Sequence, residues 1–178
     1  MIEALQTSVS INALIWLSLV MFVIHDLEEI IWVEPVLRKQ KSHILKRIPK
    51  GFVSLYEDML NMTSSQFAVA VLLEFIILTV ITFSAAEYGK YFWFLAFISI
   101  FFIHVFTHVG QSLLLKIYTP GVVTAVVLVL PFTSYTLYRM IDESLVSWNE
   151  ILISIPFGVL IVPIVLIGHY IGRKLIPN

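Results

Sequence analysis

The sequence has no cysteine and few charged residues, and both shortages limit the chemistry that the chain can perform. Without cysteine there can be no disulfide, thiolate nucleophile, iron–sulfur cluster or thiolate zinc site, so a bound metal would depend on His, Asp and Glu. Charged residues make up only 13% of the 178 residues, and the formal net charge is −1. Such a composition provides no broad basic surface, so we exclude nucleic acid as a partner.

Long apolar runs fill most of the chain, which is 59% hydrophobic with a mean hydropathy of +0.94. A helix needs about 20 mostly apolar residues to cross a bilayer. The sequence predicts five such spans: Ile11 to Val33, Phe67 to Ala85, Tyr91 to Leu115, Gly121 to Tyr138, and Asn149 to Ile171. The predicted fold class is therefore all-α, a polytopic transmembrane helix bundle that forms a single domain over residues 1–178 of a multi-pass cell-membrane protein.

Prolines mark the predicted ends and bends of these spans. Pro35 is expected to close the first span, whereas Pro131, Pro156 and Pro163 lie inside spans and predict kinks and not breaks. No Lys or Arg precedes the first apolar run, and this run continues into a charged cluster. We therefore expect a retained span there, not a cleaved signal peptide.

Lysine and arginine predict the orientation of the bundle. Five spans place all of the eleven basic residues except Lys90 and Arg139 on one side, which is expected to be cytoplasmic. The N-terminus is then outside and the C-terminus inside. The basic segment 35–62 is read either as an amphipathic helix on the inner leaflet or as a solvated loop, and His43 within it is expected to be solvated.

Ionisable residues inside the spans are the most informative feature, because each costs roughly 2.5 to 3.5 kcal/mol at mid-bilayer. They are His25, Glu28 and Glu29 in the first span, Glu74 in the second, and His104 and His108 in the third. The first three share one helical face at i, i+3 and i+4, and Asp26 is expected to point elsewhere. Such faces are unsuited to lipid and predict a shared polar site.

The depths of these residues in the membrane agree with a shared site. At about 1.5 Å per residue, His25 lies roughly 12 Å, Glu74 about 10 Å and the two histidines of the third span about 10 to 16 Å from their cytoplasmic ends. Thr107 and Gln111 share a face with His104 and His108. His169 lies near the cytoplasmic end of the fifth span, where it either joins the site or is solvated at the interface. The predicted site is therefore near the cytoplasmic leaflet.

Three motifs in the chain resemble those of the HXXEE domain family. Residues 25–29 fit the HxxEE pattern, a further histidine follows at position 104 or 108, and Tyr118 to Gly121 fit a YxPG pattern. The resemblance covers most of the chain and implies a small multi-helix membrane protein defined by these carboxylates, the second histidine and the YxPG turn. It implies no firm activity, so function must be argued from chemistry.

A metal site is the first functional hypothesis, because helical metal sites use i, i+3 and i, i+4 pairs of His and Glu. The expected ligands of a divalent ion, Zn or Fe, are His25, Glu28, Glu29, His104 and His108. Glu28, Glu29 and Glu74 are the expected catalytic residues, and Trp32, Gln111 and Tyr118 are expected to line a substrate pocket. The predicted protein is an enzyme with hydrolytic or oxidative chemistry on a lipid or other hydrophobic molecule.

Three alternatives stay open. The first is a metal-free His/Glu isomerase, by analogy with the emopamil-binding-type sterol isomerases, which share no motif with this chain. The second is a proton- or cation-coupled transporter, although the apolar outer halves of the spans favour a closed pocket. The third is a purely structural role for the polar residues. A CAAX-type protease is disfavoured because Val33 occupies the position of its arginine. The sequence neither predicts nor excludes a homo-oligomer.

Overall fold

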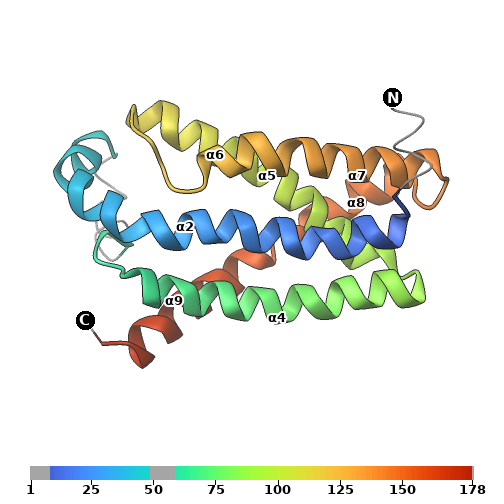
Figure 1. The fold of residues 1–178 in the computed structure, drawn as a ribbon, viewed down its shortest axis with the longest axis horizontal. Helices are drawn as coiled ribbons and strands as arrows, with labels where there is room; N and C mark the ends of the chain where they lie inside the picture. The colour runs from blue at the N-terminus through green and yellow to red at the C-terminus, as the bar shows by residue number, and fades with distance from the viewer. Residues whose placement is uncertain (1–8, 49–58, 178) are drawn as a thin grey trace.

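Helices account for the architecture of the described part of the chain, residues 9–48 and 59–177 of a computed structural model, and no strand occurs there (Figure 1). Their bounds are α2 Ile11–Arg47, α4 Ser64–Tyr88, α5 Tyr91–Leu115, α6 Val122–Thr124, the π-helical turn η2 Ala125–Val129, α7 Leu130–Asp142, α8 Trp148–Gly158 and α9 Ile161–Leu175. The prediction of an all-α bundle is confirmed.

Four stretches within these ranges are long and apolar enough to cross a membrane: Ser64–Tyr88, Tyr91–Leu115, Val122–Asp142 and Trp148–Leu175. They match the second to fifth predicted spans closely. α2 runs alongside them, and it begins at the end of the bundle opposite to the end of α9, as an odd number of crossings requires (Figure 1). The chain is an integral membrane helix bundle.

The helix of the first span does not end at Pro35, contrary to expectation, but continues to Arg47. Tertiary contacts hold the extension in place: the Glu34 carboxylate accepts a hydrogen bond from the Ser64 amide at 2.9 Å. A proline costs a helix one hydrogen bond, and these contacts offset that loss. The first half of segment 35–62 is thus a continuation of α2, while residues 49–58 lie outside the described chain.

His43 anchors this extension to the third crossing. Its Nε2 lies 2.8 Å from the Leu115 carbonyl at the end of α5, and one Arg47 guanidinium nitrogen lies close to both ring nitrogens. A carbonyl only accepts, so Nε2–H donates to it and Nδ1 is the ring atom that can accept from the guanidinium. The expectation that His43 is solvated is therefore wrong, because the histidine satisfies a carbonyl that the end of a helix leaves without an intrahelical donor.

The internal prolines distort helices without ending the crossings. The π-helical turn η2 comes immediately before Pro131, where the missing amide disturbs regular hydrogen bonding. In the last crossing, α8 ends two residues after Pro156 and α9 begins two residues before Pro163. Val159 and Leu160 keep right-handed helical dihedrals through the interruption, as expected for a kinked helix.

The two halves of the last crossing pack on different helices through glycines. A Cβ atom on Gly158 of α8 would lie 2.5 Å from the Ala96 carbonyl oxygen of α5. On α9, Cβ atoms on Gly168 and Gly172 would lie 2.6 Å from Ala70 Cα and 2.3 Å from the Gln66 carbonyl oxygen of α4. Small residues four apart allow such close backbone contact between membrane helices.

Replacement of Gly172 by alanine is expected to destabilise the bundle by about 1 to 3 kcal/mol, because the new methyl group overlaps the α4 backbone. The matched control is Gly110→Ala on α5, where an added Cβ meets nothing within 4 Å. The control should be neutral or slightly stabilising because alanine favours helices. Thermal unfolding in detergent measures both variants, and equal midpoints would contradict the close α4–α9 contact.

Candidate metal centre

Four side chains from two helices converge on one point of the bundle. α2 contributes His25 and Glu29, and α5 contributes His104 and His108, each pair one helical turn apart. Each residue offers one ligand atom, and the four atoms all lie within 4.8 Å of one another. The structure thus brings together four of the five predicted metal ligands. We call these four residues the ligand group.

His25 is held in one orientation by a polar relay. Its Nδ1 lies 2.9 Å from the Thr124 hydroxyl, which in turn lies 2.6 Å from the Glu28 carboxylate. A carboxylate only accepts, so the hydroxyl proton points to Glu28 and the hydroxyl oxygen accepts from His25 Nδ1–H. The remaining ring atom, Nε2, then carries a lone pair. It is buried and has no hydrogen-bond partner among the described residues.

Glu28 lies outside the ligand group, although the sequence predicts it as a ligand and catalytic residue. Its carboxylate accepts hydrogen bonds from the Tyr118 hydroxyl at 2.6 Å, the Thr124 amide at 2.7 Å and the Val123 amide at 3.4 Å, besides the Thr124 hydroxyl. The two amides belong to the first turn of the fourth crossing, where a carboxylate is favourable. Its contacts give Glu28 a positioning role.

Tyr118 contacts Glu28 of the HxxEE segment and no member of the ligand group. Partial burial and the hydrogen bond to Glu28 raise the pKa of its hydroxyl above the ordinary value, so the group remains a proton donor. Together with Thr124, it connects the turn before the fourth crossing to the HxxEE segment of α2. Tyr118, the first residue of the YxPG pattern, therefore contacts Glu28, the first of the two glutamates of the HxxEE pattern.

Gly121, the last residue of the YxPG pattern, lies directly against the ligand group. Its φ is +86°, and an added Cβ would lie 2.6 Å from His108 Cε1 and 2.8 Å from Glu29 Oε1. Both the backbone conformation and the close approach require glycine. The turn thus covers two members of the ligand group from the side of the fourth crossing.

The donor atoms are close enough for one tetrahedral ion after side-chain adjustment. His108 Nε2 lies 2.8 Å from His104 Nε2 and 3.1 Å from Glu29 Oε1, and all four donor atoms lie within 4.8 Å of one another. Metal–ligand bonds of about 2.0–2.1 Å at a tetrahedral angle place donor atoms roughly 3.4 Å apart, so the two short pairs would open by about half an ångström and the widest pairs would close. Buried His25 Nε2 would supply the remaining bond. The donor set of three imidazoles and one carboxylate suits Zn and Fe.

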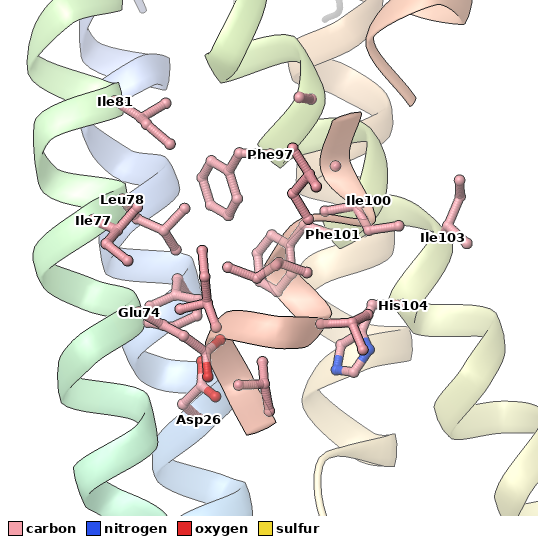
Figure 2. Close-up of a pocket in the computed structure, with 18 of the residues that line it drawn as sticks. Asp26, Glu74, Ile77, Leu78, Ile81, Phe97, Ile100, Phe101, Ile103 and His104 are labelled. Carbon is pink, nitrogen blue, oxygen red and sulfur yellow. The ribbon is translucent and has the colours of Figure 1, made fainter. Parts of the chain in front are cut away.

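A cavity of about 760 Å³ adjoins the ligand group, and its wall includes His25, Glu29 and His104. Figure 2 shows Asp26 and Glu74 on one wall of this cavity and His104 across from them. Glu74 is therefore close to the ligand group without belonging to it. It faces the cavity with its carboxyl group and could exchange a proton with a molecule bound there.

Asp26 and His169 occupy positions that the sequence reasoning did not assign to the site. The side chain of Asp26 does not point away but is buried, 6% exposed, and faces the same cavity. His169 is not solvated either, since it is 7% exposed and packs with its ring centroid 5.2 Å from that of Phe67. Two features of the sequence could have assigned Asp26 to the site. It is an acidic residue inside a predicted span, and it precedes Glu29 by three residues.

The three residues predicted to line a substrate pocket lie outside this cavity. Trp32 is 48% exposed with its ring centroid 6.3 Å from that of Tyr118, and Gln111 is also exposed. None of the three is among the residues that form the cavity wall. Trp32 and Gln111 lie one turn from a member of the ligand group, toward the basic end of the bundle.

Comparisons with known proteins agree with the motif. A family model described as "Protein of unknown function with HXXEE motif" matches residues 16–136, which include the whole ligand group and the YxPG turn. The chain is 26% identical over 165 residues to the uncharacterized protein YrkK of Bacillus subtilis (strain 168), with 86% of this chain and 92% of that protein covered. No solved structure matches the chain significantly. Because the family match covers well over half of the sequence, the chain belongs to the HXXEE family.

Proposed function

We propose that this protein is a multi-pass cell-membrane enzyme in which His25, Glu29, His104 and His108 bind one divalent ion, Zn²⁺ or Fe²⁺. The substrate would be a lipid or another hydrophobic molecule in the adjoining cavity. The observation that carries the proposal is the relay from Glu28 through Thr124 to His25, which leaves a buried imidazole nitrogen with a free lone pair beside three further donors. Metal-binding histidines are commonly oriented in this way by a group on their other nitrogen.

Burial supports this interpretation over a structural one. His25 and His108 are 1% and 4% exposed, and Glu29 is largely buried with them. Interhelical polar contacts in membranes stabilise by only about 0.6 kcal/mol on average, much less than the cost of placing such groups there. A bound cation would neutralise the carboxylate and use the lone pairs of all three imidazoles.

A bound ion would supply Lewis acidity, which activates water or polarises a substrate oxygen. The residues of the chain would do the rest. His104 is the exposed member of the ligand group and faces the cavity, so a substrate would approach from its side. Glu74, which faces the cavity and is not a ligand, would accept and return a proton. The apolar wall would exclude bulk water from the reacting groups.

Charge distribution supports the proposed orientation, with the N-terminus outside and the C-terminus in the cytoplasm. The basic extension of α2, Lys116 after α5, and Arg173 and Lys174 in the last turn of α9 all lie at one end of the bundle (Figure 1). Lys90 and Arg139 lie at the other end. Cytoplasmic ends of membrane helices carry the excess of Lys and Arg.

Elemental analysis of protein purified without added metal or a polyhistidine tag tests the proposal. We expect about one Zn or Fe per chain, removable by a chelator. A second candidate, metal-free acid–base isomerisation, is favoured by one observation, the two carboxyl side chains of Asp26 and Glu74 in the cavity wall. Absence of metal, with no uptake on addition of Zn²⁺ or Fe²⁺, would overturn the metal proposal, and pH-dependent turnover of a lipid by that metal-free protein would select the isomerase.

Acidification is expected to release the ion. Each of the three imidazoles must be neutral to ligate, so protons compete with the metal and apparent affinity decreases as pH decreases. Because up to three protons replace one ion, the dependence should be steeper than about tenfold per pH unit. Equilibrium dialysis of the loaded protein over a pH series measures it. An affinity that stays constant over the whole acidic range in which the protein remains folded would contradict a site built from three histidines.

A further inference from the structure

The cavity beside the ligand group is polar at one end and apolar along the rest of its length. The polar end contains Asp26, Glu74 and His104, whereas Ile81 and Phe97 lie farther along the same walls (Figure 2). Helices α2, α4, α5, α8 and α9 all contribute side chains to the lining. This separation of polar and apolar walls matches a molecule with one polar end and one hydrocarbon tail.

The length of the apolar part limits the size of the tail. Along α5 the lining residues extend from His104 back to Trp93, a distance of roughly 16 Å at about 1.5 Å per residue. The Trp93 ring meets Phe157 edge to face, with ring centroids 6.0 Å apart, at this far end. Since carbon–carbon bonds of about 1.5 Å advance an extended chain by somewhat less than their length, roughly ten to fourteen carbons would fit.

The polar end presents a carboxyl oxygen to which no described residue donates. Asp26 Oδ2 is buried and has no hydrogen-bond partner among the described residues, and the carboxyl side chain of Glu74 lies beside it in the wall. A hydroxyl group can donate to such an oxygen. An anionic head group such as a carboxylate has no proton to donate and would lie next to the side chains of Asp26, Glu29 and Glu74.

We propose that the cavity binds a single-chain long-chain alcohol, with its hydroxyl at Asp26 and Glu74 beside the ligand group and its tail directed along α5 toward Trp93. A volume of about 760 Å³ is within the range of pockets for one small ligand. That this alcohol is a substrate rests on the proposed function, whereas its binding does not.

Native mass spectrometry tests the proposal with an equimolar mixture of straight-chain alcohols from octyl to hexadecyl. The protein is purified in a steroid-based detergent, which has no straight alkyl chain to compete. We expect one alcohol per chain, with a maximum near dodecyl. The carboxylate of the same chain length should bind at least about tenfold more weakly, since one hydrogen bond to a charged or carboxyl group contributes about 1.5 to 3 kcal/mol.

Two neighbouring residues of α4 provide a matched pair of variants. Ile81 lines the cavity, whereas Val80 is 66% exposed on the outside of the same helix. Ile81→Trp should shift the preferred alcohol to a shorter chain because the indole occupies the path of the tail. Val80→Trp adds the same group facing lipid and should leave the preference unchanged.

The outcomes of this experiment separate the two proposals. Equal binding of all chain lengths, equal effects of Ile81→Trp and Val80→Trp, or equal binding of alcohol and carboxylate would overturn the inference even if the protein contains metal. A preserved chain-length maximum in a protein that takes up no Zn²⁺ or Fe²⁺ would support the inference and refute the proposed function.

Discussion

Replacement of His108 by alanine is expected to weaken metal binding roughly a hundredfold to a thousandfold and to yield a protein purified without its ion. His108 Nε2 lies close to two other donor atoms, at 2.8 Å from His104 Nε2 and 3.1 Å from Glu29 Oε1. Binding free energies of about 10–16 kcal/mol at four-ligand zinc sites correspond to about 2.5–4 kcal/mol per ligand. A loss of that size is roughly a hundredfold to a thousandfold in affinity.

The control for this variant is His43→Ala, which removes an imidazole that bonds the Leu115 carbonyl far from the ligand group. Metal content by elemental analysis and affinity by competition with a chelating dye should be unchanged in the control. Because His108 is buried, circular dichroism and gel filtration must show that its variant is folded. A folded His108→Ala protein with a full complement of metal would refute the ligand group.

Replacement of Thr124 by valine is expected to weaken metal binding about 10- to 100-fold although Thr124 is not a ligand. Valine has nearly the shape of threonine but cannot accept from His25 Nδ1–H or donate to Glu28. Without the relay, the imidazole of His25 loses the contact that fixes its tautomer and orientation. Loss of groups that orient metal-bound histidines has effects of this size.

Thr124→Ser tests whether the loss of metal affinity comes from the broken relay or from altered packing. Serine keeps the hydroxyl and loses only the methyl group, so its affinity should remain within a few-fold of the wild type. If valine and serine weaken binding equally, the effect comes from packing and the relay has no role. If valine weakens binding and serine does not, the hydroxyl between Glu28 and His25 is responsible.

The fold was predictable because bilayer-spanning helices leave strong marks in a sequence. Apolar runs of the required length located the crossings to within a few residues, and Pro156 and Pro163 located the kink in the last one. Pro35 was misread as an end because local chemistry alone disfavours helix there. The contacts that sustain the helix beyond it, from Ser64 and Leu115, come from segments distant in sequence.

The sequence predicted the side chains that helical periodicity brings together, but not the contacts that depend on the turn at the start of the fourth crossing. Spacings of four residues and matching depths were enough to bring His25, Glu29, His104 and His108 together. The different roles of Glu28 and Glu29 were not predictable, because the amides that engage Glu28 come from the first turn of the fourth crossing. Thr124 carried no signal, since an isolated threonine in an apolar span has no distinguishing pattern.

The kink at residues 159–160 divides the last crossing between two partners, since α8 packs on α5 and α9 packs on α4. The cavity lies between these two pairs and is lined by both. Within the last crossing, its opposite walls are therefore joined through two residues in the middle of the membrane span. A change of bend at that joint would alter the width of the cavity and leave the glycine contacts of each pair intact. The size of the molecule that the cavity can hold thus depends on the same short stretch of backbone.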